Sequence, residues 1–318
     1  MSEPPWVGVL GARSLVGRHL LPLVTMRSAR VLAVSRSQAT PTQQALITWC
    51  LPGDPPAVAS PLPDWIALCP IWTVAAHLPW LESLGVQRLV ALSSMSVATK
   101  TGSPDAQERR LAGRLAAAEE GLLDWADSSG VGLTILRPTM IYDGLHDRNV
   151  AAIAACVRRC GWFPLCGAAE GLRQPVHAGD VAAACVAALK RDPPRRSYTL
   201  SGGEPLPFRE LVERTCRAHG LTPRTLSLPP WLWRTLATVA ERVGLMPGSA
   251  VGIGQRMNED LSASHAEAAL DLGFAPRPFV PGSGRWAADA AASLASPAAV
   301  ETVSPGVHSQ LYRPPHAP

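Results

Sequence analysis

The sequence predicts an α/β protein in which a doubly wound parallel sheet is followed by a smaller C-terminal domain. Continuous apolar runs alternate with segments of helical periodicity through the first half, which is typical of parallel strands covered on both faces. A glycine-containing turn joins the first apolar run to the first helical segment. After Pro138 this alternation stops and shorter, less regular segments follow. The length of 318 residues fits one large domain with a smaller appendage.

The first half contains six expected strands in continuous apolar runs. The strands are 6–10, 31–34, 45–50, 65–69, 88–92 and 131–136. Helical periodicity predicts helices over 16–26, 74–84 and 105–129. The connection 51–64 holds five prolines, so we expect a loop or one short helical turn there instead of an ordinary helix.

The second half predicts mostly helices, over 149–160, 180–190, 208–219 and 230–243, with one strand at 197–200. The glycine-rich stretch 161–174 is expected to be irregular. We assign 1–204 mainly to the sheet domain, with 141–176 contributing to the substrate side, and 205–282 to a small C-terminal domain. The Ala-, Ser- and Pro-rich remainder, 283–318, predicts a largely mobile tail with an alanine-rich helix near 286–294.

Composition excludes several classes of protein. The net charge is +4 and no run of five like charges occurs, which argues against nucleic-acid binding. The longest apolar runs are about half the length of a bilayer span, and the N-terminus has no basic leader before an apolar stretch, so we expect a cytoplasmic protein without a transmembrane segment. Seven cysteines without a Cys-x-x-Cys motif indicate reduced core residues and no metal site.

The glycine turn after the first strand is the strongest local motif. It reads Gly8-Val9-Leu10-Gly11-Ala12-Arg13-Ser14-Leu15-Val16-Gly17. A dinucleotide site needs a tight turn, a close approach of the backbone to the pyrophosphate, and the free N–H groups of a helix N-terminus. Gly11 and Gly17 suit the first and third glycine roles, and Ser14 stands where glycine is usual. We therefore predict that residues 11 and 13–17 bind a dinucleotide; a plain packing turn is the alternative.

The end of the second strand favours NADP over NAD. This segment reads Ala33-Val34-Ser35-Arg36 and lacks the acidic residue that accepts hydrogen bonds from the ribose of NAD. Arg36, together with Arg13 in the glycine turn, offers fixed positive charge and a fork of donors to a 2′-phosphate. The alternative is that both arginines are simply solvated.

Four further segments resemble those of the extended short-chain dehydrogenase/reductase superfamily, of the NAD-dependent epimerase/dehydratase type. They are Leu89–Ser94 with paired serines, Ile135–Tyr142 with a Leu-Arg-Pro signature, Gln174–Ala182 with Val-His-x-x-Asp-Val-Ala, and Asp271–Pro276. Together with the glycine turn they occur in the family's order. The resemblance implies a Rossmann domain and a smaller substrate domain, and it adds Ser93 and Pro138 to the expected cofactor contacts.

The family's catalysis uses a Tyr-x-x-x-Lys pair, which this chain lacks. Its three tyrosines are followed four residues later by His146, Gly202 and His316, and Leu111 and Leu115 hold the spacing of the pair. The chain therefore resembles an atypical member. Ser94 aligns with the family's catalytic hydroxyl, while Lys100 and Tyr142 follow the fifth and sixth strands, where ligands bind in such sheets. For Lys100 a solvated loop lysine, and for Tyr142 a packed core aromatic, are the alternatives.

Three functions follow from these residues. The leading hypothesis is an NADP-dependent reductase of a small molecule, with Ser94, Lys100 or Tyr142 polarising a carbonyl. The second is a non-catalytic dinucleotide-binding redox sensor or assembly factor. The third, by analogy of fold, is a nucleotide-sugar epimerase with altered catalytic residues.

Overall fold

The computed structural model describes residues 5–27, 29–36, 46–54, 61–103, 105–147, 149–190, 196–243 and 250–282. The expected tail and its alanine-rich helix lie outside these residues. Met1–Ser283 form one compact unit. Throughout the described ranges, every helix is too short or too polar to span a bilayer.

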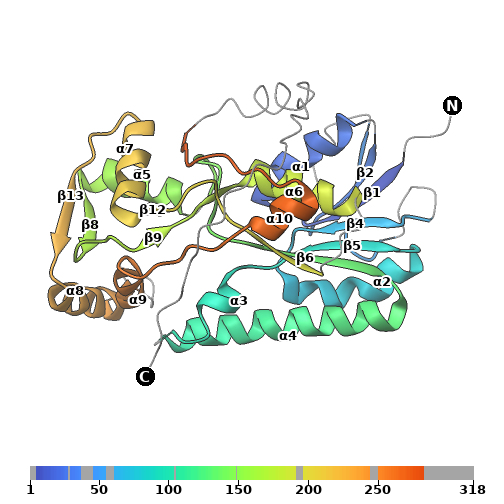
Figure 1. Ribbon diagram of the computed structural model, residues 1–318, viewed down its shortest axis with the longest axis horizontal. Helices are drawn as coiled ribbons and strands as arrows, with labels where there is room; N and C mark the ends of the chain where they lie inside the picture. The colour runs from blue at the N-terminus through green and yellow to red at the C-terminus, as the bar shows by residue number, and fades with distance from the viewer. Residues whose placement is uncertain are drawn as a thin grey trace, which may run out of the picture. The chain divides into compact units, whose positions relative to one another are not determined.

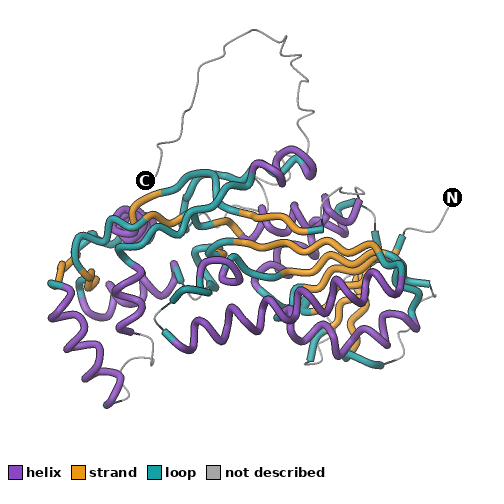
Figure 2. The backbone as a smooth tube through the Cα atoms, turned by 60° about the horizontal axis from the view of Figure 1, so that its bottom comes forward, coloured by secondary structure: helices purple, strands orange, loops and turns teal. Residues whose placement is uncertain are grey.

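A seven-stranded parallel sheet forms the centre of this unit, which confirms the predicted fold class (Figure 1). The strand order is β11-β6-β5-β4-β1-β2-β3. From β1 the chain adds β2 and β3 on one side and then β4, β5, β6 and β11 on the other, so the order switches sides between β1 and β4. The strands, orange in Figure 2, lie side by side with helices on both sides. They are β1 (Trp6–Leu10), β2 (Arg30–Val34), β3 (Ile47–Cys50), β4 (Asp64–Ala67), β5 (Arg88–Leu92), β6 (Gly132–Pro138) and β11 (Ser197–Leu200).

Helices cover both faces of the sheet because its central strands are apolar on both sides. On one face lie α1 (Leu15–Thr25) and α6 (Ala178–Lys190), and on the other lie α2 (Leu78–Ser83), α3 (Ser96–Thr99) and α4 (Ala106–Ser129) (Figure 1). The 3₁₀ helix η1 (Ile71–His77) leads into α2. Trp65 of β4 is fully buried in the core beside α4, and a Cβ on Gly8 of β1 would lie only 2.3 Å from its ring. Glycine in β1 therefore makes room for this tryptophan.

A second core lies among the elements that follow β6. The helices that contribute to it are α5 (Val150–Cys160), α7 (Phe208–Ala218), α8 (Pro230–Arg242) and α9 (Ala250–Arg256), and the short strands of this region are β7 (Ile141–Tyr142), β8 (Phe163–Cys166), β9 (Leu172–Arg173), β10 (Val176–His177), β12 (Leu206–Pro207) and β13 (Thr225–Leu228). The helix α10 (Ala266–Leu272) contacts β11 and α6 instead. Buried Leu211 and Trp233 are part of this core, which is separate from the one around Trp65.

The stretch 161–174 differs from its expected irregular structure. It contributes β8 and β9, which pair with β13 and β12 from later in the chain. Sequence periodicity gave no signal because both strands are short and their partners are distant. The domain boundary between 204 and 205 stays a prediction.

Residues 274–282, which we term the closing segment, return to both parts of the unit. Arg277 donates to the Asp180 carboxylate of α6 through its backbone N–H at 3.0 Å and its guanidinium at 2.7 Å. Phe279 N–H donates to Glu204, and Val280 N–H donates to the Tyr142 hydroxyl. These bonds tie the last described residues to the sheet helices and to the second core.

Candidate functional site

The turn between β1 and α1 brings backbone atoms so close together that two of its positions have no room for a side chain. Gly11 has φ +71°, and a Cβ there would lie 2.7 Å from the Cys69 nitrogen. A Cβ on Gly17 would lie 2.2 Å from the Ala12 carbonyl oxygen. Both contacts are with backbone, which cannot move aside as a side chain can. Glycine is therefore required at both positions, one for the turn and one for close packing of the helix.

Ser14 begins α1 in place of the usual middle glycine. Its side-chain oxygen accepts a hydrogen bond from Gly17 N–H at 3.1 Å, so it is the N-cap of the helix. Leu15 and Val16 also belong to the first turn, where N–H groups have no intrahelical partner. These groups and the positive end of the helix dipole fit a pyrophosphate. The residues predicted from the sequence thus fit the phosphate part of a dinucleotide, although this assignment stays a prediction.

The two arginines expected near the adenosine ribose lie on the β1-β2-β3 side of the sheet. Arg13 is exposed, and its guanidinium carbon lies 5.5 Å from the ring centroid of Trp49 in β3, a cation–π distance. Arg36 is exposed just after β2. No acidic side chain stands in the segment 33–36 that ends this strand. The arrangement is able to receive a phosphate group, and the choice of NADP stays a prediction.

The ends of β5 and β6 are held by a buried carboxylate that the sequence analysis did not assign. Glu119 of α4 is 4% exposed. It accepts hydrogen bonds from the Ser93 hydroxyl and from the Arg137 guanidinium, whose Nε lies 3.0 Å from Oε2. The Ser93 hydroxyl is therefore engaged inside the protein. Pro138 is buried at the end of β6, and its carbonyl accepts from Met95 N–H at 3.0 Å.

Ser94 is half-buried in the loop between β5 and α3. Its Oγ accepts a hydrogen bond from Ser96 N–H at 3.1 Å, which initiates the turn into α3. Since the oxygen acts as acceptor in this bond, the hydroxyl proton is able to point elsewhere. Of the three expected catalytic groups, Ser94 is the one whose hydroxyl lies at the carboxyl end of a central strand.

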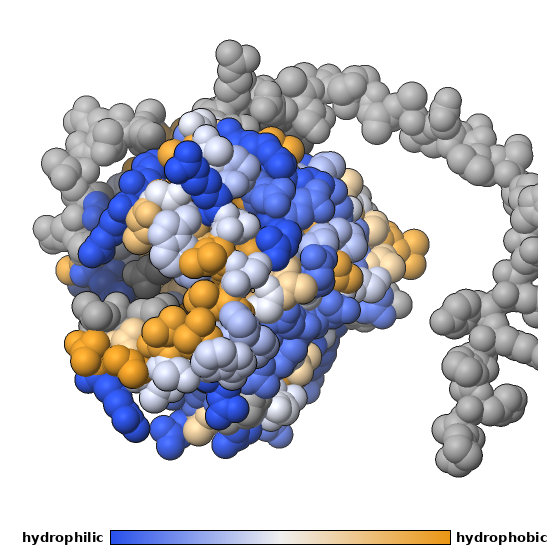
Figure 3. Space-filling view, turned by 90° about the vertical axis from the view of Figure 1, so that its left-hand side faces the viewer, coloured by the Kyte–Doolittle hydropathy of each residue, from blue (hydrophilic) through white to orange (hydrophobic). Residues whose placement is uncertain are grey.

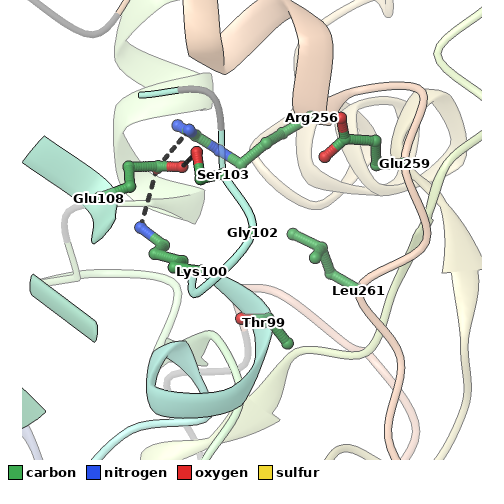
Figure 4. Close-up of a pocket in the computed structure, with 8 residues that line it drawn as sticks. All are labelled: Thr99, Lys100, Gly102, Ser103, Glu108, Arg256, Glu259 and Leu261. Atoms are coloured by element: carbon green, nitrogen blue, oxygen red, sulfur yellow. Dashed lines mark hydrogen bonds and ion pairs between the residues drawn. The ribbon is translucent and has the colours of Figure 1, made fainter. Parts of the chain in front are cut away.

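Lys100 takes part in an ion-pair cluster. Its Nζ lies 3.0 Å from Glu108 Oε1, and the same carboxylate accepts from Ser103 at 2.8 Å and contacts Arg256 of α9 (Figure 4). Burial alone would raise the pKa of Glu108, but the Ser103 hydrogen bond and the charges of Lys100 and Arg256 outweigh it and hold that pKa below its usual range. Lys100 is therefore paired with a carboxylate whose ionised form these contacts favour.

A cavity of about 320 Å³ opens beside this cluster. Its walls come from the α3–α4 connection and from the region after α9 (Figure 4). The lining residues are Thr99, Lys100, Gly102, Ser103, Glu108, Arg256, Glu259 and Leu261. Of these residues only Lys100 was predicted as a site residue from the sequence, because Glu108 and Arg256 are 148 residues apart.

Tyr142 is fully buried, in contrast to the position expected of a proton donor at a site mouth. Its hydroxyl accepts from Val280 N–H at 3.2 Å, and its ring meets His177 and Phe279 edge to face. Burial raises the pKa of Tyr142 to about 12. The environment is that of a packed aromatic, so the structure does not bring Tyr142 together with Ser94 and Lys100 in one cluster; its catalytic role stays a prediction.

The α4 positions where we expected a Tyr/Lys pair by resemblance are occupied by core residues. Leu115 is buried, and Leu111 packs against the same core beneath α4. Between them in sequence, Arg114 stacks over the ring of Trp72 in η1 at 4.3 Å. Trp72 follows β4 closely, near the point where the strand order reverses. Across the described ranges, no group of three or more His, Cys, Asp or Glu residues is arranged to hold a metal ion.

Comparison with known proteins agrees with the fold. No protein-family model matches the chain. One similar curated protein is NADH dehydrogenase (ubiquinone) 1 alpha subcomplex subunit 9, mitochondrial, of Arabidopsis thaliana, which is 34% identical over 151 residues. The match covers 46% of this chain and 35% of that protein, so the chain spans about a third of the length of this relative.

Solved structures match over most of the chain. A putative epimerase from Burkholderia cenocepacia has a TM-score of 0.63 at 16% identity, covering 91% of this chain and 99% of that one. The UDP-glucose 4-epimerase of Thermus thermophilus, solved with NAD, has a TM-score of 0.60 at 18% identity, covering 87% and 96%. RMD of Pseudomonas aeruginosa, solved with NADPH, has a TM-score of 0.57 at 16% identity, covering 88% and 96%. The chain therefore shares the fold of these proteins, two of which were solved with a nicotinamide dinucleotide.

Proposed function

We propose that the chain binds NADP(H) at the β1–α1 turn as a non-catalytic protein, a redox sensor or a subunit that assembles with partners. One contrast carries this proposal. The turn keeps both glycines where a Cβ would collide with backbone, whereas the helix face that should carry a Tyr/Lys pair carries core leucines. The name of the plant relative, a subunit of a larger complex, supports the assembly role.

Bound dinucleotide would lie with its pyrophosphate on the N-terminus of α1 and its adenosine near Arg36 and Arg13. The cofactor itself supplies the capacity for hydride transfer. Proton transfer would need a side chain of this chain, and two of the three candidates are engaged. Lys100 is paired with Glu108, and Tyr142 is buried with its pKa raised to about 12. The paired lysine and the protonated, buried tyrosine favour dinucleotide binding without turnover. We expect the protein to work in the cytoplasm.

Titration of the purified chain with NADPH, NADP, NADH and NAD, followed by nicotinamide fluorescence and calorimetry, tests the proposal. We expect the phosphorylated forms to bind more tightly. Arg36→Ala should weaken NADPH binding by about 10- to 100-fold, as expected for loss of a charge-assisted hydrogen bond, and leave NADH unchanged. Arg27→Ala, an exposed arginine at the far end of α1, is the matched control. Failure of all four dinucleotides to bind would refute the proposal.

A second candidate function, a small-molecule reductase, is favoured by Ser94. Its hydroxyl proton is available at the carboxyl end of β5, and the short helix α3 separates it from the cavity beside Lys100. This candidate predicts substrate-dependent oxidation of NADPH that falls steeply in Ser94→Ala while NADPH affinity is kept. Tight NADPH binding without turnover over a panel of aldehydes, ketones and nucleotide sugars would support the non-catalytic function instead.

A further inference from the structure

The outer face of α8 carries an apolar stripe. Leu232, Leu236, Val239 and Val243 follow one another at spacings of four, three and four residues, which places them on one side of a helix. Leu236 is 50% exposed, Val239 53% and Val243 62%. We call these four residues the α8 stripe.

The α8 stripe is distinct from the face by which the helix is held. Trp233 and Ala237 are buried, and Trp233 Nε1 donates to the Ala250 carbonyl at 3.0 Å. A Cβ on Gly254 of α9 would lie 2.1 Å from the Trp233 ring, so α9 is shaped to receive this side chain. One apolar face of α8, with Trp233 and Ala237, is therefore buried in the protein, and the other apolar face, the α8 stripe, is exposed to solvent.

Exposed apolar residues gather at this end of the compact unit. Among the described residues, ten large apolar side chains are exposed, and six of them lie on α8 and the paired strands β8 and β13 or next to these elements in the chain. Seen from this side, apolar surface runs as a band across the face (Figure 3). The six are Trp162, Leu226, Trp231, Leu236, Val239 and Val243. A contiguous exposed apolar surface of this kind marks an interaction site.

Unpaired arginines accompany this surface. Exposed arginines are found on α8, at the C-terminal end of α5 and just before β13; they are Arg158, Arg159, Arg224, Arg234 and Arg242. Within the described part of the chain, none of the five forms an ion pair, whereas the nearby Glu213 is paired with Arg217 at 2.9 Å. One carboxylate on α8, that of Glu241, accepts from Val251 N–H at 3.2 Å, but the five arginines outnumber it. The charge complementary to this end of the unit is therefore negative.

We propose that the α8 stripe and its arginines bind the surface of an anionic lipid bilayer. Aliphatic side chains along one face of α8, Trp231 near its start and Arg234 and Arg242 on the same helix are the combination that inserts a helix at the depth of the lipid headgroups. A second copy of the chain fits less well, because an isologous contact would bring two arginine-rich rims together. This proposal does not depend on whether the chain turns over NADPH.

Vesicle sedimentation with the full-length chain tests the proposal. The wild-type protein should sediment with phosphatidylcholine vesicles that contain phosphatidylglycerol and stay in solution with phosphatidylcholine alone. Binding should weaken as salt rises from about 0.05 to about 0.5 M, because exposed charges are then screened. The fluorescence of exposed Trp231 should shift to the blue on binding, and Trp231→Phe should reduce that shift.

Matched variants separate the stripe from a general loss of folding. Leu236→Asp with Val239→Asp should lower the partition coefficient about tenfold or more, and Arg234→Glu with Arg242→Glu should do the same at low salt. Leu270→Asp, on α10 and 77% exposed, is the control for an acidic group on an apolar surface position and should bind like wild type. Thermal melting checks that each variant is folded.

The proposal is overturned if the wild-type chain does not sediment with anionic vesicles at low salt. It is also overturned if the Leu236/Val239 variant binds as well as wild type, or if Leu270→Asp loses binding equally. A wild-type dimer that becomes a monomer in the Leu236/Val239 variant, without vesicle binding, would show that the stripe is an interface between copies and would likewise overturn it.

Discussion

The β1–α1 turn and the sheet-facing side of α4 are the two halves of one expected dinucleotide site, and they differ in what their residues do. In the turn, Gly11 and Gly17 stand where a single added carbon would strike backbone. On α4, Leu111 and Leu115 pack into the core, and Glu119 binds Ser93 and Arg137. The turn thus has a geometry that suits a phosphate, whereas this face of α4, on the other side of the sheet, is occupied by core packing and by an internal ion pair.

Replacing one glycine by alanine in each of the two regions is the most direct test of this difference. Gly17→Ala places a Cβ 2.2 Å from the Ala12 carbonyl oxygen, whereas Gly113→Ala on α4 meets nothing within 4 Å. We expect Gly17→Ala to destabilise the fold by about 2–4 kcal/mol and to weaken NADPH binding. Gly113→Ala should stabilise it by about 0.5–1 kcal/mol because alanine favours helix. Urea unfolding and NADPH titration measure both, and equal effects would contradict the comparison.

The buried carboxylate tests whether α4 serves structure. Glu119→Gln removes the charge that Arg137 needs, and we expect a loss of about 3 kcal/mol in the free energy of unfolding. Its neighbour Glu120 is exposed, so Glu120→Gln should change that free energy by less than about 0.5 kcal/mol. Chemical denaturation of the two variants side by side gives the difference. A Glu119→Gln protein as stable as wild type would remove the structural role assigned to this helix face.

His177, which packs against His19 of α1, predicts that the stability of the fold depends on pH. Burial lowers the pKa of His177 to about 3, and its ring lies 5.3 Å from that of His19 in α1. The unfolded chain, with a histidine pKa of about 6.5, binds this proton first, so stability is lost as pH falls from about 6.5 towards 3. Between pH 6.5 and 5 this loss should reach about 1–2 kcal/mol. His177→Asn, which keeps an acceptor for Gly179 N–H, should show a shallower slope in urea unfolding at these pH values; an unchanged slope would exclude His177 as the cause.

The smallest effect is expected at the cavity. Lys100→Met leaves the Glu108 carboxylate paired with Arg256 and hydrogen-bonded to Ser103, so no buried charge is left without a partner. We therefore expect a loss below about 1 kcal/mol in the free energy of unfolding and unchanged NADPH affinity. A large fall in NADPH affinity would instead place Lys100 at the dinucleotide. If the chain proves to be a reductase, the same variant shows whether this lysine is needed for turnover.

Local pattern was enough to predict most of the sheet. The runs at 6–10 and 88–92 became strands with the expected bounds, because continuous apolar residues between turns define buried strands. Short elements were missed: β13 has four residues, and α10 has seven, less than two helical turns. The predicted helix at 74–84 begins instead as the 3₁₀ helix η1, and α2 follows with Pro79 in its first turn.

The candidate site was only half predictable for a related reason. The glycine turn is contiguous in sequence, so the residue types at its positions are enough to predict its backbone geometry. The Glu119–Arg137 pair joins residues 18 apart on different elements, and the Glu108–Arg256 pair joins residues 148 apart. No spacing rule links such residues, because the pairing depends on how the helices pack on the sheet.

The closing segment has a consequence for how the chain is made. Its bonds to Asp180, Glu204 and Tyr142 span 97, 75 and 138 residues. During synthesis, each of these acceptors leaves the ribosome well before its partner exists. We therefore expect neither core to reach its final stability until residues near 280 have been translated, so that folding is completed late and nascent chains need protection from aggregation and proteolysis. A premature stop codon before Arg277 would leave the Asp180 carboxylate, 8% exposed, without its cation.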